Sequence, residues 1–489
     1  MSELVDFGEI VLVVAGAFSL ALLSTKLTER ISVPAPAIFL LAAALASDLV
    51  PALSEHISIR TVERIGVVAL IVILFDGGMK VGWRRTRAAA APIVVLGIVG
   101  TFATAGVMAV FAHAFFDFNW TVAWILGAAL APTDPAVMFS VLGNREVGGR
   151  SGTILEGESG GNDPVGIALV VGMLDFATHE DASIWTIVKD FSIEMAVGLA
   201  VGVAGAALLL QLMRRVSLPS ESLYAIRTLV AAAVIYGAAS VAHGSGFLAV
   251  FVAGLLLGDA RAPFKHEIER FQSAFASLAE ITVFAALGLT FHFSDLTKEG
   301  IWLDGILLAV LLGLVARPLV VYTLLAPMRM RWAERTFIAW TGLKGAVPIL
   351  LSTFVLLEGL DAGPRIYNLV VVIVTFSVVV QGSTVTVAAR LLRIPMRVRE
   401  LEPYSLYVGL QEEPEGVVRY RVSERSQVAG RRVRDLPIGD RTWISLIVRD
   451  GVPIQPRGSS RIQPGDEVLV LTDPDDESAV RRVFEGKEG

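Results

Sequence analysis

Long apolar runs separated by short clusters of charge dominate the first 391 positions of this chain. A helix needs about 20 apolar residues to cross the ~30 Å hydrocarbon core of a bilayer. Only 18% of the 489 residues are charged and 54% are hydrophobic, whereas soluble domains are usually about a quarter charged. The pattern therefore predicts a protein that crosses a membrane many times.

The charge clusters divide the apolar sequence into thirteen candidate spans. They lie at 8–27, 35–53, 62–79, 88–115, 120–143, 152–176, 184–213, 223–242, 245–259, 267–292, 301–326, 333–357 and 366–391. Glu3 and Asp6 precede the first run in place of a basic segment, so we interpret it as a retained span and not as a signal peptide. The predicted fold is an all-α polytopic membrane protein with about 13 transmembrane helices and a small α/β C-terminal domain.

Lys and Arg are distributed unequally between the two alternating sets of loops. One set is rich in them, and the segment after the last span adds Arg390, Arg393, Arg397 and Arg399. The other set holds only Arg60, Arg64, Lys189, Lys298 and Arg365. Loops rich in Lys and Arg face the cytoplasm. We therefore expect a multi-pass protein of the plasma (inner) membrane with its N-terminus outside and its C-terminal domain in the cytoplasm.

The composition changes abruptly near Glu400. Apolar and polar residues then alternate at 417–422, 443–448 and 467–471, and turn signals such as Asp450-Gly451 and Pro464-Gly465 separate these stretches. Such alternation is typical of short strands. We therefore divide the chain into a transmembrane domain at 1–398 and a cytoplasmic domain at 399–489.

Two spans are interrupted at mid-membrane depth by residues that disturb helices, at 131–135 (Ala-Pro-Thr-Asp-Pro) and at 342–348 (Gly-Leu-Lys-Gly-Ala-Val-Pro). Each proline removes a backbone donor, and unpaired backbone survives in a bilayer only inside protein or beside a watery cavity. The simpler interpretation is that these residues only kink packed helices. However, the breaks fall in the middle members of two triplets of spans with opposite topology, which is the inverted-repeat pattern of secondary transporters.

Asp163 lies near the middle of the sixth span. Ser159 is four residues earlier on the same helical face, and Pro164 frees the carbonyl of Gly160. Carboxylate, hydroxyl and carbonyl oxygens suit a small cation. A charged aspartate at this depth costs several kcal/mol, about 2.5–3.5 on insertion scales, unless a proton or an ion neutralises it. A proton and a cation would therefore compete for one carboxylate, which is the minimal machinery of exchange.

Other charged residues at membrane depth have competing interpretations. Glu158, Arg317 and Lys344 are expected to balance one another, with Glu158 and Arg317 as a structural pair. Asp134 is expected either to coordinate the ion through water or to hold the helix break together, and Asp76 either to end a helix at the surface or to add a ligand at the cytoplasmic mouth. We interpret Glu280 as a buried structural acid, and the histidines at outer span ends (His113, His243 and His292) as solvated.

Several motifs together resemble the NhaP-type branch of the monovalent cation:proton antiporter-1 family, over roughly the first 395 residues. They are Thr133-Asp134-Pro135, Glu158-Ser159 with Asn162-Asp163, Ala316-Arg317-Pro318, Gly342-Leu343-Lys344-Gly345, and Gly246-Phe247-Leu248-Ala249-Val250 running to Gly254 and Gly258. The resemblance implies homodimers in which a core domain moves against a dimerisation domain.

The same resemblance assigns roles to individual residues. Asp163 would bind the cation or the proton; Ser159, the Thr133 carbonyl and Asp76 would help to hold the cation, with Asp134 acting through water. Asn162 stands where electrogenic relatives have a second aspartate, which implies one-for-one, electroneutral exchange. Glu158 and Arg317 would form the structural salt bridge of the family. Lys344 replaces the more usual arginine, and because a buried lysine can lose its proton it bears on the stoichiometry.

The tail resembles the C-terminal ligand domain of the TrkA family. The matching stretch runs from Val418 through Ser426, Gly430-Arg431, Asp435-Leu436, Arg449-Asp450-Gly451, Pro456 and Gly465-Asp466 to Leu471. Such domains dimerise and often bind a small regulatory ligand, which implies a gating module; the alternative is a dimerisation or stability tail. A tail of this kind on such a core resembles the potassium/proton subgroup, so the substrate is expected to be K⁺ or Na⁺, with K⁺ favoured.

Two other classes of protein compete with the carrier. A ligand-gated potassium channel would need a selectivity filter, and no Thr-Val-Gly-Tyr-Gly-like stretch is present. A membrane enzyme would need a nucleophile or metal set, but there are no cysteines and the six histidines have no metal-ligand spacing. We expect no enzymatic activity, no cofactor other than the transported ions and a possible tail ligand, contact with membrane lipids, and no nucleic-acid partner.

Overall fold

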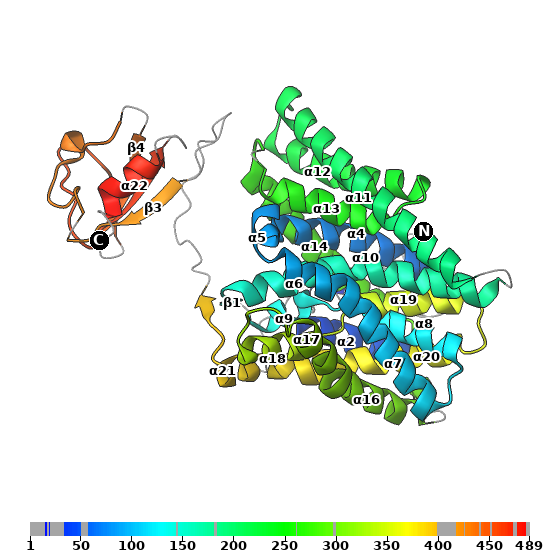
Figure 1. Ribbon diagram of the computed structural model, residues 1–489. Coiled ribbons are helices and arrows are strands. Elements are labelled where there is room, and N and C mark those ends of the chain that lie inside the picture. The colour runs from blue at the N-terminus through cyan, green and yellow to red at the C-terminus, as the bar shows by residue number, and fades with distance from the viewer. Residues whose placement is uncertain are drawn as a thin grey trace. The chain divides into compact units, whose positions relative to one another are not determined.

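The computed structural model describes residues 15–16, 19, 34–49, 57–142, 145–179, 183–260, 262–296, 300–398, 417–424, 426–439, 442–449, 452–472 and 477–485. The chain divides into two compact units, Met1–Leu401 and Glu402–Gly489. The first unit is helical, and its longer helices run side by side (Figure 1). The predicted span at 8–27 lies almost wholly outside the described residues.

A helix, or a set of consecutive helices, occupies the position of every predicted span from residue 35 onward. The uninterrupted ones are α2 (Ala35–Leu49), α4 (Ile59–Val81), α10 (Arg150–Thr178), α11 (Ile184–Arg215), α12 (Glu221–Val241), α13 (Gly246–Gly258) and α14 (Lys265–Gly288). Short helices α5 (Trp83–Ala88) and α15 (Phe293–Leu296) flank two of the others. Among the described residues, six helices are long and apolar enough to cross a membrane. α4 and α10 are as long, but they carry the polar residues of the candidate site.

Three long helices each contain a π-helical segment. α6 (Ala90–Val94) continues through η1 (Val95–Gly100) into α7 (Thr101–Phe116). α16 (Ile301–Leu311) continues through η3 (Leu312–Ala316) into α17 (Arg317–Leu324), and α20 (Gly363–Phe376) through η4 (Ser377–Gly382) into α21 (Ser383–Leu391). Segments of this kind are rare and are often found at functional sites.

The two predicted interruptions are present as breaks between helices. α8 (Trp120–Leu130) and α9 (Pro135–Leu142) are separated by residues without helical structure, as are α18 (Trp332–Trp340) and α19 (Ala346–Leu357). Pro132 and Pro135 cannot donate to the helical ladder, which ends α8. The two breaks touch, because the Asp134 N–H donates to the Leu343 carbonyl at 2.8 Å. We call residues 131–134 the first break and 341–345 the second break.

Close helix packing depends on glycine at a few points. A Cβ on Gly78 of α4 would overlap the backbone of Phe251, and a Cβ on Gly254 of α13 would overlap the backbone of Phe75. Backbone cannot move aside as a flexible side chain can, so larger residues would force α4 and α13 apart.

A small two-stranded sheet joins distant parts of the first unit. β1 (Arg145–Val147), between α9 and α10, pairs antiparallel with β2 (Met396–Val398), which follows α21. The Gly148 N–H extends the ladder by donating to the Pro395 carbonyl at 2.7 Å.

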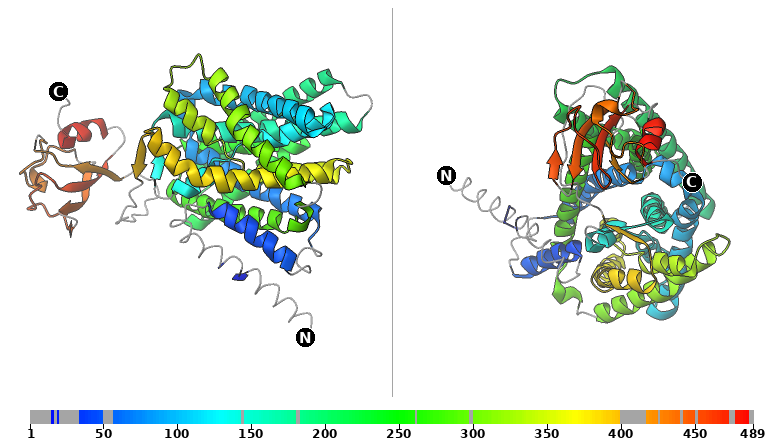
Figure 2. Two further views of the ribbon diagram at one scale, coloured as in Figure 1. Left: turned by 90° about the horizontal axis from the view of Figure 1, so that it is seen from below. Right: turned by 90° about the vertical axis from the view of Figure 1, so that its left-hand side faces the viewer.

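The described residues of the second unit form a four-stranded antiparallel sheet with a helix against it (Figure 2). The strands β3 (Val417–Arg421), β4 (Thr442–Arg449), β5 (Val452–Ile454) and β6 (Glu467–Thr472) have the order β3-β6-β4-β5. α22 (Glu477–Glu485) completes the core, where the rings of Tyr420 and Phe484 stack with centroids 5.0 Å apart. A single 3₁₀ turn, η5 (Val433–Asp435), lies between β3 and β4. The three predicted strand positions match β3, β4 and β6.

Candidate functional site

Asp163 lies in the interior of α10 and is 5% exposed. Its Oδ1 atom has no hydrogen-bond partner among the described residues. Ser159, one turn earlier, is also buried. α10 remains one helix although Pro164 lies inside it. A buried carboxylate with a vacant oxygen is costly unless something neutralises it, so this position can hold a proton or a cation.

Asn162 connects α10 to the first break. Its Nδ2 donates to the Thr133 hydroxyl at 2.7 Å, and its Oδ1 accepts the Thr133 N–H at 3.3 Å. Asn162 is 1% exposed and Thr133 is 5% exposed. The amide therefore supplies partners that the interrupted backbone needs in a water-poor environment. This bridge places the first break directly beside Asp163.

Lys344 of the second break closes the end of α8. Its Nζ donates to the carbonyls of Ala131 and Pro132 at 3.0 and 2.8 Å, and the residue is 1% exposed. These carbonyls lie at the C-terminal end of α8, where the helix dipole concentrates partial negative charge. An ammonium group is therefore favoured at this position. The hydrogen-bond partners of Lys344 Nζ are thus these backbone oxygens, and its charge balance with Glu158 and Arg317 stays a prediction.

Asp134 occupies the complementary position at the other helix end. Its carboxylate lies so close to Gly345 that a Cβ on that glycine would overlap it. Gly345 is the N-cap residue of α19, and the N-terminal end of a helix carries partial positive charge. Each break thus places a charged side chain at the helix end of the other break. Lys344 lies at the negative end of α8, and Asp134 lies beside the positive end of α19.

Glu158 and Arg317 form a buried ion pair one residue before Ser159. Arg317 Nη2 lies 2.5 Å from Glu158 Oε1, and the side chains are 3% and 1% exposed. The guanidinium also lies against Gly342, where a Cβ would overlap its Nε. Arg317 therefore links α10 to the second break, at a residue two positions before Lys344.

Two further acids lie on α4 and α14. Asp76 is 3% exposed; its carboxylate pairs with Lys80 at 2.6 Å and accepts the Ser273 hydroxyl at 2.9 Å. Its contacts are thus with Lys80 on its own helix and with Ser273 on α14. Glu280 of α14 has a buried Oε1 without a hydrogen-bond partner among the described residues.

Two of the predicted solvated histidines have specific partners. His113 Nδ1 lies 2.7 Å from the Phe118 carbonyl and its ring stacks on Trp120. His292 Nδ1 lies 2.8 Å from Asp48 Oδ1.

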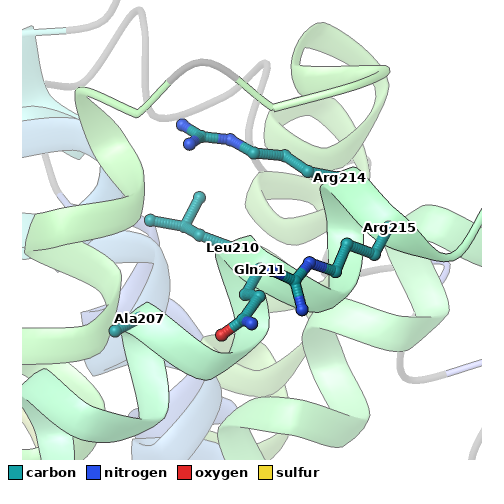
Figure 3. Close-up of a pocket in the computed structure, with 5 residues that line it drawn as sticks. All are labelled: Ala207, Leu210, Gln211, Arg214 and Arg215. Carbon is teal, nitrogen blue, oxygen red and sulfur yellow. The ribbon is translucent and has the colours of Figure 1, made fainter.

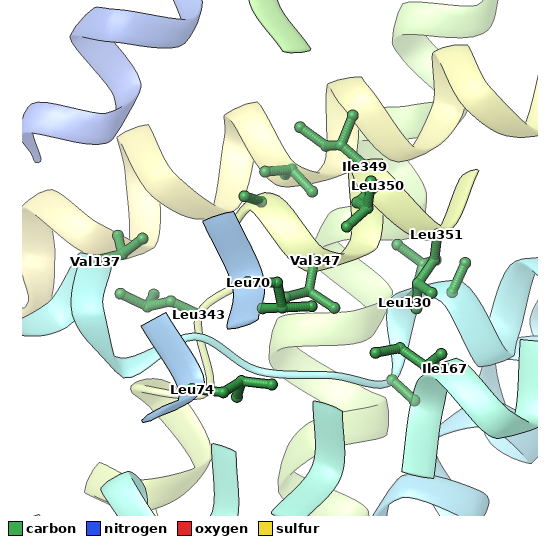
Figure 4. Close-up of a cluster of buried hydrophobic side chains, with 14 of the residues drawn as sticks. Leu70, Leu74, Leu130, Val137, Ile167, Leu343, Val347, Ile349, Leu350 and Leu351 are labelled. Carbon is green, nitrogen blue, oxygen red and sulfur yellow. The ribbon is translucent and has the colours of Figure 1, made fainter. Parts of the chain in front are cut away.

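Apolar side chains surround the contact between the breaks (Figure 4). Leu130, Val137, Leu343 and Val347 flank the breaks themselves, and Ile167 comes from α10; all are buried. Such a wall keeps the local dielectric low, which strengthens every electrostatic interaction inside it.

Sequence reasoning missed two polar residues of the last span. Ser377 and Gln381 of η4 are 1% and 6% exposed, and Ser377 accepts the backbone N–H of Lys344 at 3.0 Å. Their spacing of four puts both on one helical face, but Thr375, Ser383 and Thr384 in the same run make that signal weak.

A surface pocket of about 380 Å³ lies elsewhere, at the end of α11 (Figure 3). Its lining includes Leu210, Gln211, Arg214 and Arg215. None of the predicted ion-site residues is among those that line it.

Comparison with known proteins identifies the family of each unit. The model of "Sodium/hydrogen exchanger, transmembrane" matches residues 16–391, and that of the TrkA-C domain matches residues 417–485. The chain is 32% identical over 475 residues to the "K(+)/H(+) antiporter NhaP2" of a Shewanella species (strain ANA-3), covering 95% of this chain and 81% of the relative. It is 30% identical over 465 residues to the "K(+)/H(+) antiporter NhaP" of Alkalimonas amylolytica, covering 94% and 80%.

The fold is also found in a solved structure. The sodium proton antiporter MjNhaP1 from Methanocaldococcus jannaschii aligns with a TM-score of 0.67 at 23% identity, over 80% of this chain and 99% of that one. The resemblance noted in the sequence is thereby confirmed, and a multi-pass membrane protein is the expected form of such a chain. This chain belongs to the sodium/hydrogen exchanger family of transmembrane cation/proton antiporters and carries a TrkA-C domain after its transmembrane part.

Proposed function

We propose that this antiporter exchanges K⁺ or Na⁺ for H⁺ by competition of the two for the Asp163 carboxylate, with alternating access from the two sides of the membrane. The observation that carries the proposal is the buried Asp163 with an unpartnered oxygen, next to a residue that binds the first break. Proton and cation each neutralise the same charge, so only one of them is bound at a time.

The proposed cation ligands come from α10 and the first break. Ser159 contributes a hydroxyl from the same helical face as Asp163. The hydroxyl and N–H of Thr133 are bonded to Asn162, which leaves the Thr133 carbonyl as its ligand. Asp134 acts through water, and Asp76, whose present partners are Lys80 and Ser273, serves as a cation ligand only after exchanging them.

We propose a stoichiometry of one proton for one cation. Asn162 carries no charge and is bonded to Thr133, so Asp163 is the one titrating member of this pair. The contacts of Lys344 with two carbonyls support a fixed positive charge there. One proton lost for one cation gained leaves the charge of the loaded site unchanged, which makes exchange electroneutral.

Potassium is the expected preferred cation. The support is that relatives matching over 94–95% of this chain, tail included, are named K(+)/H(+) antiporters. Proton flux driven by K⁺ and by Na⁺ in the same vesicles measures the preference.

We further propose thirteen spans with inverted repeats, domains at 1–398 and 399–489, an outside N-terminus, a cytoplasmic tail and a homodimer. The charge distribution of the loops supports the orientation. Because the chain has no cysteine, single-cysteine variants have no background labelling. Ser2→Cys should react with an impermeant maleimide on intact cells, and Ser459→Cys, an exposed tail position, only after permeabilisation.

The tail is proposed to regulate transport through the β1–β2 ladder. β2 ends directly before residues 399–416, which lead to the tail, and its partner β1 ends just before α10, the helix of Asp163. A displacement of β2 would therefore act on β1 and, two residues further on, on the start of α10.

Purified protein in vesicles with an internal pH dye tests the transport mechanism. The wild type should show cation-driven proton flux that saturates with cation, and Asp163→Asn should abolish it without preventing folding. Asp361→Asn, the same change at an exposed turn, is the matched control and should keep full flux. Wild-type flux in Asp163→Asn would refute the mechanism, and an unsaturable current would indicate a channel.

A further inference from the structure

The second break leaves backbone groups without helical partners. Residues 342–345 have no helical structure, and the Lys344 N–H is therefore not part of a helix ladder. Lys344 is 1% exposed, so water does not replace the lost acceptor. A buried N–H of this kind needs a partner from elsewhere in the protein.

Ser377 of η4 supplies that partner. Its Oγ accepts the Lys344 N–H at 3.0 Å and donates to Gln381 Oε1 at 2.7 Å. The hydroxyl thus accepts and donates at once, and the bond to Gln381 fixes the direction in which its lone pairs point.

The amide of Gln381 lies against η3. A Cβ on Gly313 would lie 2.8 Å from Gln381 Nε2, so the glycine makes room for the amide. Gly313 lies four residues before Arg317, the partner of Glu158. The side chain of Gln381 in η4 therefore lies against Gly313 of η3.

The chain of contacts ends at the ion site. Gln381 orients Ser377, Ser377 holds the backbone of Lys344, and Lys344 Nζ holds the Ala131 and Pro132 carbonyls at the end of α8. The first break follows directly, with Thr133 bound to the neighbour of Asp163. Displacement of the Lys344 backbone would move the ammonium off the α8 carbonyls and loosen the first break.

We propose that Ser377 and Gln381 are positioning residues for cation/proton exchange, because they fix the second break and, through Lys344, the geometry of the cation site on the first break. The proposal rests on the proposed function, since it concerns the same site. Neither residue is among the proposed cation ligands.

The test compares Ser377→Ala, Ser377→Thr and Gln381→Met with Ser352→Ala. Ser352 of α19 is a matched control, because it is fully buried and its hydroxyl donates only to Ile349 of its own helix. Proton flux in vesicles gives the apparent KM for K⁺ and the pH profile, and thermal unfolding of the purified protein reports folding.

We expect Ser377→Ala to raise the apparent KM by about tenfold, the size expected when a buried N–H loses its acceptor, and to shift the pH profile. Gln381→Met should give a smaller change in the same direction. Ser377→Thr keeps the hydroxyl and should restore wild-type values, and Ser352→Ala should not differ from wild type in KM or pH profile.

Wild-type KM and pH profile in Ser377→Ala would overturn the positioning role, as would an equal change in Ser352→Ala. A lower melting temperature with unchanged KM would also overturn it, since it would show a structural role alone. Failure of the proposed function would give a different result, because exchange would then survive Asp163→Asn.

Discussion

Removal of one partner from the Glu158–Arg317 pair should destabilise the protein strongly. The pair is 2.5 Å apart and almost completely buried, and Arg317 also lies against Gly342 of the second break. Glu158→Gln leaves an uncompensated guanidinium charge in an apolar environment. Breaking a buried pair in this way typically costs about 3–5 kcal/mol, whereas replacing both partners by uncharged groups is often nearly neutral.

The chain offers a matched surface pair as control. Arg365 and Asp304 are 3.4 Å apart, but their side chains are 37% and 31% exposed. Such a pair contributes about 0–1 kcal/mol, so Asp304→Asn should change the free energy of unfolding little.

Unfolding of purified protein in mixed micelles by increasing SDS measures these differences. Glu158→Gln and Arg317→Met should each lower the free energy of unfolding by several kcal/mol more than Asp304→Asn, and the double variant should recover most of the loss. A double variant equal to the sum of the single changes would show that the two residues do not act as a pair. Single variants as stable as Asp304→Asn would refute the burial argument.

Three further predictions concern other contacts. Lys344→Gln removes the positive charge from the end of α8 and should lower vesicle flux at least tenfold, whereas Lys344→Arg should retain more of it; equal flux would contradict the charge role. Arg397→Pro removes a backbone donor from β2, so deletion of the tail should change flux less in this variant than in the wild type. An equal change in both would contradict the coupling of the tail to the ion site through the β1–β2 ladder. In the tail, burial raises the pKa of Asp466, but hydrogen bonds from Arg449 and the Gln463 N–H outweigh burial and lower the pKa overall. A lowered folded-state pKa adds stability above the unfolded pKa that is lost as pH falls through the folded value. As the pH is lowered, the tail of Arg449→Gln should therefore open at a higher pH than that of the wild type. Hydrogen exchange of the backbone amides measures this opening.

Much of the fold follows from local patterns in the sequence. Hydropathy and charge place α4, α10 and α11 within a few residues of their observed ends. Pro132, Pro135 and Gly342 likewise locate both breaks, because proline and glycine act on the backbone of their own segment. The Glu158–Arg317 pair was expected from charge balance and from the family resemblance, and it is present.

Other features depend on contacts between distant segments, which no local pattern specifies. The acceptors of Lys344 Nζ are backbone carbonyls about 210 positions earlier, and backbone acceptors leave no mark in the sequence. β1 and β2 are three residues each and rich in charge, so they do not show the alternation typical of strands. Ser377 and Gln381 become informative only once η4 is seen beside the second break.

Proton release on cation binding tests the central claim most directly. Purified protein in weakly buffered detergent solution at a pH where Asp163 is protonated is titrated with KCl, and released protons are measured alongside bound K⁺. We predict one proton released per K⁺ bound in the wild type, with neither binding nor release in Asp163→Asn. Binding of K⁺ without proton release, or release that persists in the variant, would contradict the account.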